Sequence, residues 1–319
     1  MLIKAALSCA SPAGPDGKLS ILIFHRVLPH PDPLMPSEPD VNRFDQIIRW
    51  ITDWFNVLPL GEAVEQLKRH QLPARAAAIT FDDGYADNLL HATPILRKHG
   101  VRATFFIATG YIDGGLMWND ALTESIRAAR QSHIDLGFLG LGSVSLSSTE
   151  EKRLVLEQAI TAIKPRPHED ILSAVSRIQD ICGEAMPDNL MLTTPQLKEL
   201  VANGMELGAH TVNHPNLTNL LDPEVSREII DSRDFLSSLA GQPIQTFAYP
   251  NGRLGRDYLP RHAQIVRELG FSAAVTTNWG VSSSTSDLFQ LPRFTPWDRL
   301  KPMFGLRLLS NCQPPKQLD

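Results

Sequence analysis

Two adjacent carboxylates, Asp82 and Asp83, end an apolar run in the stretch AAAITFDDGYADN, residues 76–88. Small and apolar residues that stop at charge and glycine are typical of a buried strand followed by a turn. Gly84 allows the backbone to turn sharply directly after the strand. We therefore expect the doublet at a strand end, where the two carboxylates can divide metal binding and proton transfer between them.

Two histidines, His210 and His214, lie four positions apart in GAHTVNHPNL, residues 208–217. At helical or tight-turn spacing both imidazoles can face one metal ion. Two histidines and one carboxylate leave coordination positions open, as in catalytic rather than structural sites. Such a metal activates water and polarises a carbonyl group. One aspartate, Asp82 or Asp83, would bind the metal, and its unligated neighbour would act as general base.

Each motif alone has a simpler interpretation. Asp-Asp-Gly after a strand is most often a turn or a helix start, and an isolated HxxxH pair more often lies on a helix surface. Together, at the strand ends of one sheet, the two motifs are far more specific for a metal site.

Short apolar segments are predicted to be strands, and the amphipathic segments between them to be helices. The strands are expected within 20–27, 76–84, 102–110, 205–211, 244–250 and 271–277, and the helices within 41–55, 86–100, 194–204, 222–241 and 259–270. This alternation indicates a parallel sheet covered by helices, either a barrel or a doubly wound sheet. In both, reactive groups gather at the carboxyl ends of the strands.

Residues 116–193 interrupt the alternation and are predicted to be a mostly helical insertion, which forms a lid or a groove wall. The other expected divisions are an N-terminal extension (1–19), a main domain that includes the insertion (20–310) and a C-terminal tail (311–319). Trp118 lies just after a predicted strand end, as does Trp279, and each either stacks on a ligand ring or packs in the core.

The composition excludes several classes of protein. The 319-residue chain has a formal net charge of −5 and no basic run, which argues against a nucleic-acid or anionic-membrane partner. Its three cysteines are far apart and odd in number, so no disulfide framework is expected. No stretch is long and apolar enough to span a membrane, and the N-terminus as given favours a cytoplasmic protein. The oligomeric state is not predicted.

The stretches TFDDGYADN and HTVNH resemble the first two signature motifs of the polysaccharide deacetylase family, carbohydrate esterase family four. ATFFIATGYI (103–112) resembles the strand after the first motif, and FAYPNGR (247–253) resembles the third motif. The resemblance implies a distorted (β/α) barrel of about seven parallel strands. It also implies a divalent metal, chiefly zinc with cobalt, nickel or manganese as alternatives, and a location beyond the cytoplasm.

The resemblance assigns roles residue by residue. Asp82 matches the catalytic base, and Asp83, His210 and His214 match the metal triad. Thr211 matches the small hydroxyl residue between the histidines. Pro250 and the backbone amide of Asn251 match the groove wall and the oxyanion donor, and Tyr249 before them is expected beside the substrate.

Departures from the family pattern leave some roles open. The third motif lacks the arginine that orients the base, and Arg253 or Arg293 is the candidate replacement near the substrate. Asn251 replaces a usual tyrosine, which keeps a backbone donor but loses an aromatic contact. The late Leu-x-His motif that supplies the general acid in many members is absent, and LPRF (291–294) stands there.

His25 is the candidate for the missing general acid. It stands at the predicted strand end within ILIFHRV (21–27), a stretch that resembles the start of an exopolysaccharide deacetylase branch with circularly permuted motifs and an N-terminal acid. The alternative is a core histidine bonded to the backbone.

We therefore expect a metal-dependent hydrolase that removes N-acetyl groups from amino sugars in a polysaccharide or oligosaccharide, such as an exopolysaccharide containing N-acetylglucosamine. Two alternatives stay open. One is a deacylase of a small or lipid-linked amino sugar, and the other is a non-catalytic carbohydrate-binding protein on the same fold.

Overall fold

The structure is a computed structural model that describes residues 2–183, 186–296 and 298–312, so residues 313–319 of the expected tail lie outside it. Its centre is a seven-stranded sheet in the order β1-β3-β4-β7-β8-β9, with β2 also paired to β3. Every pair in this sheet is parallel. The strands are β1 (Leu19–Phe24), β2 (Asn56–Val57), β3 (Ala76–Phe81), β4 (Thr104–Ile107), β7 (Glu206–Ala209), β8 (Thr246–Ala248) and β9 (Ala273–Val275).

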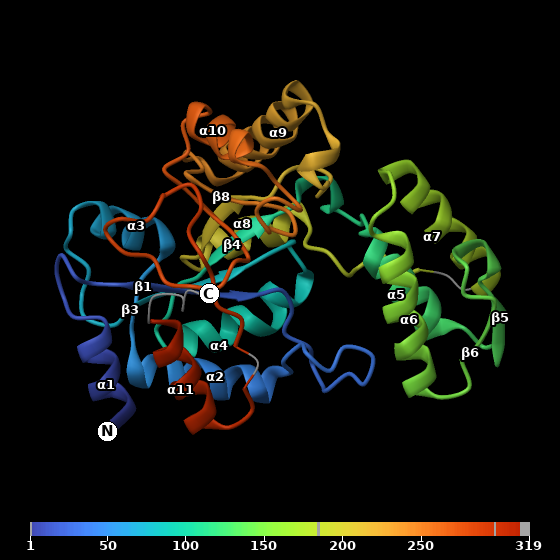
Figure 1. Cartoon of the computed structure of the whole chain (residues 1–319), viewed down its shortest axis with the longest axis horizontal. Helices are drawn as coiled ribbons and strands as arrows, with labels where there is room; N and C mark the ends of the chain where they lie inside the picture. Colours follow the sequence, from blue (N-terminus) through green and yellow to red (C-terminus); the bar gives the residue numbers. More distant parts are fainter. Residues whose placement is uncertain (1, 184–185, 297, 313–319) are drawn as a thin grey trace, which may run out of the picture.

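The sheet curls into a distorted α/β barrel, which confirms the predicted fold class (Figure 1). The gap between β9 and β1 is bridged by a short extended segment, residues 291–294. Leu291 bridges in parallel to Val275 of β9, and Phe294 bridges in parallel to Leu22 of β1. This segment therefore closes the barrel, because it pairs with both outer strands, β9 and β1.

Helices cover the outside of the sheet because each buries one apolar face. In α2, Phe44, Ile47, Ile48 and Ile51 are buried, and the Asp40 side chain caps the first turn. Helices α9 and α10 pack together, as do α1 and α11 (Figure 1). The bounds are α1 (Leu2–Ala10), α2 (Val41–Trp54), α3 (Leu60–Lys68), α4 (Thr93–Lys98), α8 (Thr194–Ala202), α9 (Asp222–Ala240), α10 (Pro260–Glu268) and α11 (Lys301–Asn311).

The strands are buried on both faces, as their near-continuous apolar runs require. Phe81 of β3 stacks on Phe105 of β4, with ring centroids 4.8 Å apart, and Phe24 of β1 lies on its other side. Fully burying such a ring contributes about 2–3 kcal/mol. The aromatic stack thus fixes β1, β3 and β4 next to the ends that carry His25, Asp82 and Asp83.

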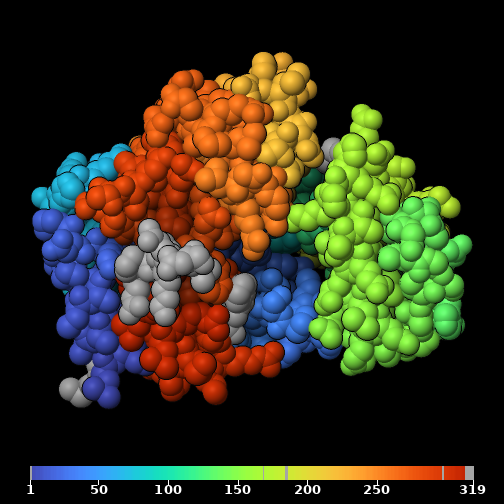
Figure 2. Space-filling view, in the orientation of Figure 1, coloured from blue at the N-terminus to red at the C-terminus, as the bar shows by residue number. Residues whose placement is uncertain are grey.

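Residues 116–182 form a lobe with an apolar core of its own, built from side chains such as Leu122, Ile126 and Ile178. The lobe holds α5 (Trp118–Ala128), α6 (Thr149–Ile163), α7 (His168–Cys182) and a hairpin of β5 (His133–Asp135) with β6 (Ser143–Ser145). It lies to one side of the barrel, and the surface is hollowed between the two (Figure 2). Among the described residues, no helix combines the length and the apolar character needed to cross a bilayer.

Candidate active site

The ladder of the sheet continues one step beyond the strands and fixes the polar residues that follow them. The amide of Asp82 donates to the carbonyl of Phe24 at 3.0 Å, and the amide of His210 donates to the carbonyl of Ile107 at 3.2 Å. Asp82 and Asp83 follow β3, His210 follows β7 and His25 follows β1. Because the strands are parallel, these side chains meet at one edge of the sheet.

Three potential metal ligands converge there. The ligand atoms of Asp83, His210 and His214 all lie within 4.8 Å of one another. The Nε2 atoms of His210 and His214 are 3.4 Å and 3.5 Å from Asp83 Oδ1. Ligand atoms about 2.0–2.2 Å from a tetrahedral zinc ion are about 3.3–3.6 Å apart. The spacing and the chemistry of this donor set therefore fit a small divalent cation.

The surroundings of the triad prepare its atoms for binding. His210 Nδ1 lies 2.7 Å from the carbonyl of Ala248. A carbonyl can only accept, so Nδ1 carries the proton and Nε2 keeps its lone pair. Burial lowers the pKa of His214 to about 4, which keeps that imidazole neutral near pH 7. Burial alone would raise the pKa of Asp83, but its contacts with the histidines bring it well below its usual value.

The second aspartate of the doublet is held by an arginine. Arg293 Nη1 donates to Asp82 Oδ1 at 2.7 Å, and Nη2 donates to Oδ2 at 2.6 Å. The guanidinium is fixed in turn by Nε, which donates to the carbonyl of Thr276. Burial raises the pKa of Asp82, but the charge and hydrogen bonds of Arg293 together with the nearby histidines outweigh it, and the pKa is lowered. Of the two candidate arginines, Arg293 contacts Asp82, whereas Arg253 is exposed.

A cavity of about 640 Å³ opens over these groups, between the barrel and the lobe. The residues that line it include Asp82, Asp83, His210, His214, His25, Asn251 and Trp118. Both aspartates, both histidines and His25 were expected at one site, and the structure brings all five to this cavity. Trp279 is half exposed and does not line this cavity.

Four residues expected beside the substrate lie behind the cavity wall instead: Thr211, Tyr249, Pro250 and Arg293. Tyr249 is fully buried, stacks on Tyr258 at 4.0 Å and donates its hydroxyl to the carbonyl of Phe289. Thr211 Oγ1 donates to the carbonyl of His210 and accepts from the amide of His214 at 3.1 Å. None of the four lines the cavity: Thr211 and Tyr249 hold the loops that carry the site, and Arg293 holds Asp82.

The backbone around the site adopts an unusual conformation. Positive φ angles occur at Asp83 (77°), Thr211 (65°), His214 (49°) and Asn251 (58°). A non-glycine residue with positive φ is uncommon and costs about 1–3 kcal/mol. Such angles turn the chain tightly enough to aim His210 and His214 at the same point.

Sequence reasoning missed a buried polar group on the lobe side of the cavity. Asp120 of α5 accepts the hydroxyl of Tyr85 at 3.0 Å, and the Arg26 guanidinium lies 4.7 Å over the Tyr85 ring. Arg26 Nε in turn donates to Asp87 at 2.8 Å. Burial, with the nearby charge of Asp83, raises the pKa of Asp120 to about 7. Tyr85 and Asp87 belong to the first motif, but no spacing in the sequence links them to Asp120.

The chain is similar to known deacetylases. The family model described as polysaccharide deacetylase matches residues 69–274. YxkH of Bacillus subtilis (strain 168), named as a candidate polysaccharide deacetylase, is 22% identical over 278 residues, which are 86% of this chain and 70% of that protein.

Two solved structures extend the comparison. The Streptococcus pyogenes deacetylase PplD in complex with acetate is 25% identical, with a TM-score of 0.61, and the match covers 93% of this chain and 99% of that chain. IcaB from Ammonifex degensii is 19% identical, with a TM-score of 0.58, and covers 95% of this chain and 99% of its own. The likeness to IcaB shows that the fold is shared.

Proposed function

Because the chain belongs to the polysaccharide deacetylase family, we propose that it is a metal-dependent hydrolase of N-acetylated amino sugars in a polysaccharide or oligosaccharide. One observation carries the proposal. The Asp83–His210–His214 triad lies in the same cavity as Asp82, whose carboxylate is held ionised by Arg293. Acetate, the small product of this reaction, is present in the PplD complex, which supports the choice of acyl group.

Asp83, His210 and His214 would hold the cation, and zinc suits two imidazoles and one carboxylate. The cation would supply Lewis acidity and a water of lowered pKa. The alternatives to zinc are cobalt, nickel and manganese. They prefer other coordination geometries and ligands, but each would be held by the same three residues here.

The remaining steps belong to side chains of this chain. Asp82 accepts the proton of the attacking water, since Arg293 keeps its carboxylate ionised and oriented. The backbone amide of Asn251 makes no hydrogen bond within the described part of the chain and is available to the developing oxyanion. His25, which lines the same cavity, donates a proton to the leaving amine. Trp118 supplies an aromatic face for a sugar ring.

The test is acetate release from N-acetylglucosamine oligomers by wild type and Asp82→Asn, each with and without a chelator. Wild type should lose activity with the chelator and recover it when zinc returns. Asp82→Asn should bind metal normally and turn over at least 10²-fold more slowly, roughly the value of a positioned base. Wild-type rates in Asp82→Asn would remove Asp82 as the base. Sugar binding by metal-loaded wild type without acetate release would favour the non-catalytic alternative.

A further inference from the structure

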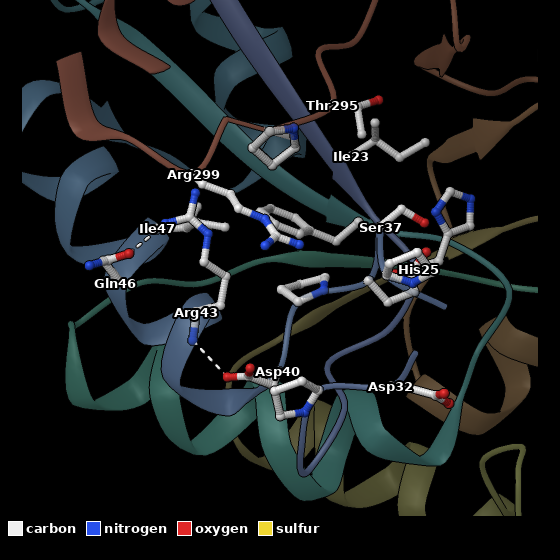
Figure 3. Close-up of a pocket in the computed structure, with 16 residues that line it drawn as sticks. Ile23, His25, Asp32, Ser37, Asp40, Arg43, Gln46, Ile47, Thr295 and Arg299 are labelled. Atoms are coloured by element: carbon white, nitrogen blue, oxygen red, sulfur yellow. Dashed lines mark hydrogen bonds between the residues drawn. The ribbon is translucent and has the colours of Figure 1, made fainter. Parts of the chain in front are cut away.

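A second cavity, of about 740 Å³, adjoins the candidate active site (Figure 3). Four residues, His25, Pro36, Ser37 and Glu38, line both cavities. Each cavity falls in the range of roughly 300–1,000 Å³ typical of small-molecule sites. A glycan with one sugar over the metal triad can therefore continue past His25 into the second cavity.

Two arginines, Arg43 and Arg299, lie at the end of the second cavity away from His25 (Figure 3). Arg43 Nη1 donates to the Gln46 side chain, Nη2 donates to the carbonyl of Asp298, and the guanidinium lies 4.7 Å over the Trp50 ring. A guanidinium has five N–H donors, so most of those of Arg43 remain available. Its position is fixed by α2, and although the Asp298 and Asp40 carboxylates lie near enough to act on its charge, neither forms an ion pair with its guanidinium within the described residues.

Arg299 is exposed and makes no hydrogen bond or ion pair with the described residues, because the carboxylate of the adjacent Asp298 pairs with Arg307 at 2.7 Å instead. Burial, followed by the charge of Arg299, lowers the pKa of Arg43, which is the effect expected of two guanidiniums close together. The nearby Asp298 and Asp40 carboxylates offset this repulsion only in part, since the pKa of Arg43 is lowered in spite of them, and a bound anion would relieve it further.

The carboxylates that line the second cavity are already committed to other donors. Asp40 accepts from the backbone amides of Asn42 and Arg43 at the start of α2. Asp32 forms an ion pair with Arg127 at 2.7 Å. The Glu38 carboxylate accepts from the backbone amide of Arg26 at 3.3 Å. Within the described chain, none of these acids pairs with the Arg43 or Arg299 side chain.

We propose that Arg43 and Arg299 form a subsite for an anionic group, a carboxylate or a phosphate, on a unit of the glycan next to the deacetylated sugar. Guanidinium groups recognise both anions through paired hydrogen bonds. The inference rests on the proposed function and narrows its substrate to acidic N-acetylated glycans. A neutral homopolymer would leave the arginine pair without a partner.

Three oligomers of equal length test the subsite: neutral N-acetylglucosamine, N-acetylglucosamine alternating with glucuronic acid, and N-acetylglucosamine joined by phosphodiesters. Wild type should show at least tenfold higher kcat/KM for one acidic oligomer than for the neutral one, about the effect of one hydrogen bond between charged groups. The acidic oligomer that is preferred identifies the anion. Arg299→Gln should remove most of the preference and leave the neutral oligomer unaffected. Arg69→Gln, an exposed arginine outside both cavities, is the matched control.

Binding to the chelated protein, measured by calorimetry, separates this inference from the proposed function. If no oligomer releases acetate, the proposed function fails, yet tighter binding of an acidic oligomer that Arg299→Gln weakens would still support the subsite. Equal dissociation constants for neutral and acidic oligomers would overturn it, as would a loss in Arg299→Gln that is the same for all three. Arg43→Gln serves as a second variant, with its thermal unfolding checked because Arg43 packs on Trp50.

Discussion

Arg293 and Asp82 lie 211 positions apart in the chain and meet as a buried ion pair in which both carboxylate oxygens accept from one guanidinium. Arg293 sits in the segment 291–294 that bridges β9 and β1. The segment that closes the barrel therefore also orients the Asp82 carboxylate. If Asp82 is the base, as we propose, Arg293 takes the place of the arginine missing from the third motif.

Replacing Arg293 should impair both stability and catalysis. In Arg293→Met the Asp82 carboxylate is left buried without its partner, which costs about 3–5 kcal/mol in free energy of unfolding at pH 7. The pKa of Asp82 should rise, so the acid limb of the pH–rate profile should move to higher pH. Urea unfolding and the pH dependence of kcat/KM measure the two effects. Arg253→Met changes an exposed side chain and should change neither, whereas an unshifted acid limb in Arg293→Met would contradict the orienting role.

His25→Gln should slow hydrolysis about 10²-fold or more with little change in metal content, if His25 protonates the leaving amine. An activated aryl acetamide, whose leaving amine needs no proton, should be hydrolysed by the variant at nearly the wild-type rate. That dependence on the leaving group distinguishes proton donation from a packing defect. His99→Gln, outside the cavity and paired with Asp45, is the control. Equal losses on both substrates would exclude the acid role.

Metal removal should be visible in stability as well as in activity. A ligand that binds only the folded state adds about 2.7 kcal/mol when present at 100 times its dissociation constant. Zinc should therefore raise the unfolding temperature of wild type and leave that of His214→Ala nearly unchanged. His133→Ala, a change at an exposed histidine, should respond like wild type. Stoichiometric metal in purified His214→Ala, measured by mass spectrometry, would argue against the triad.

Asp120 gives a pH-dependent prediction for the chelated protein. Its folded pKa is raised to about 7, so its contribution to stability is complete below the unfolded value of about 3.9 and is lost as pH rises through 7. The loss amounts to about 4 kcal/mol at most. Asp120→Asn keeps the shape and an acceptor for Tyr85 but cannot ionise. Between pH 4 and pH 8, the free energy of unfolding of the variant should therefore rise relative to that of wild type. If the difference between the two proteins does not change with pH, Asp120 titrates normally.

Trp118, which is half-buried, and Trp279, which is half exposed, should behave differently. Trp118 lines the catalytic cavity, whereas Trp279 packs near Phe294, with ring centroids 5.7 Å apart. Loss of a stacking ring costs about 1 kcal/mol, or roughly a fivefold rise in KM. Trp118→Ala should show this rise for oligosaccharides with kcat preserved, and Trp279→Ala should not. A rise in KM for both variants would place the sugar elsewhere.

The positions of the strands followed from the sequence because apolar runs and turn residues are local signals. Asp82, Asp83 and His210 could be assigned to one site, since parallel strands end at one edge. The partner of Asp82 could not be chosen between Arg253 and Arg293, because the bridge at 291–294 depends on barrel closure. Tyr249 was expected at the substrate, but the pattern of a short strand does not tell which face the residue after it will take. The short elements β2, α3 and α11 were not predicted.

The left-handed conformations of Asp83, Thr211, His214 and Asn251 constrain how the sequence can evolve at these positions. Each such residue costs about 1–3 kcal/mol of conformational free energy, which other contacts of the fold must offset. A duplicated copy released from selection for turnover would gain stability by relaxing these loops, while its barrel stayed intact. Glycine or asparagine at the equivalents of Thr211 and His214 would then be an early mark of a lineage that has abandoned hydrolysis.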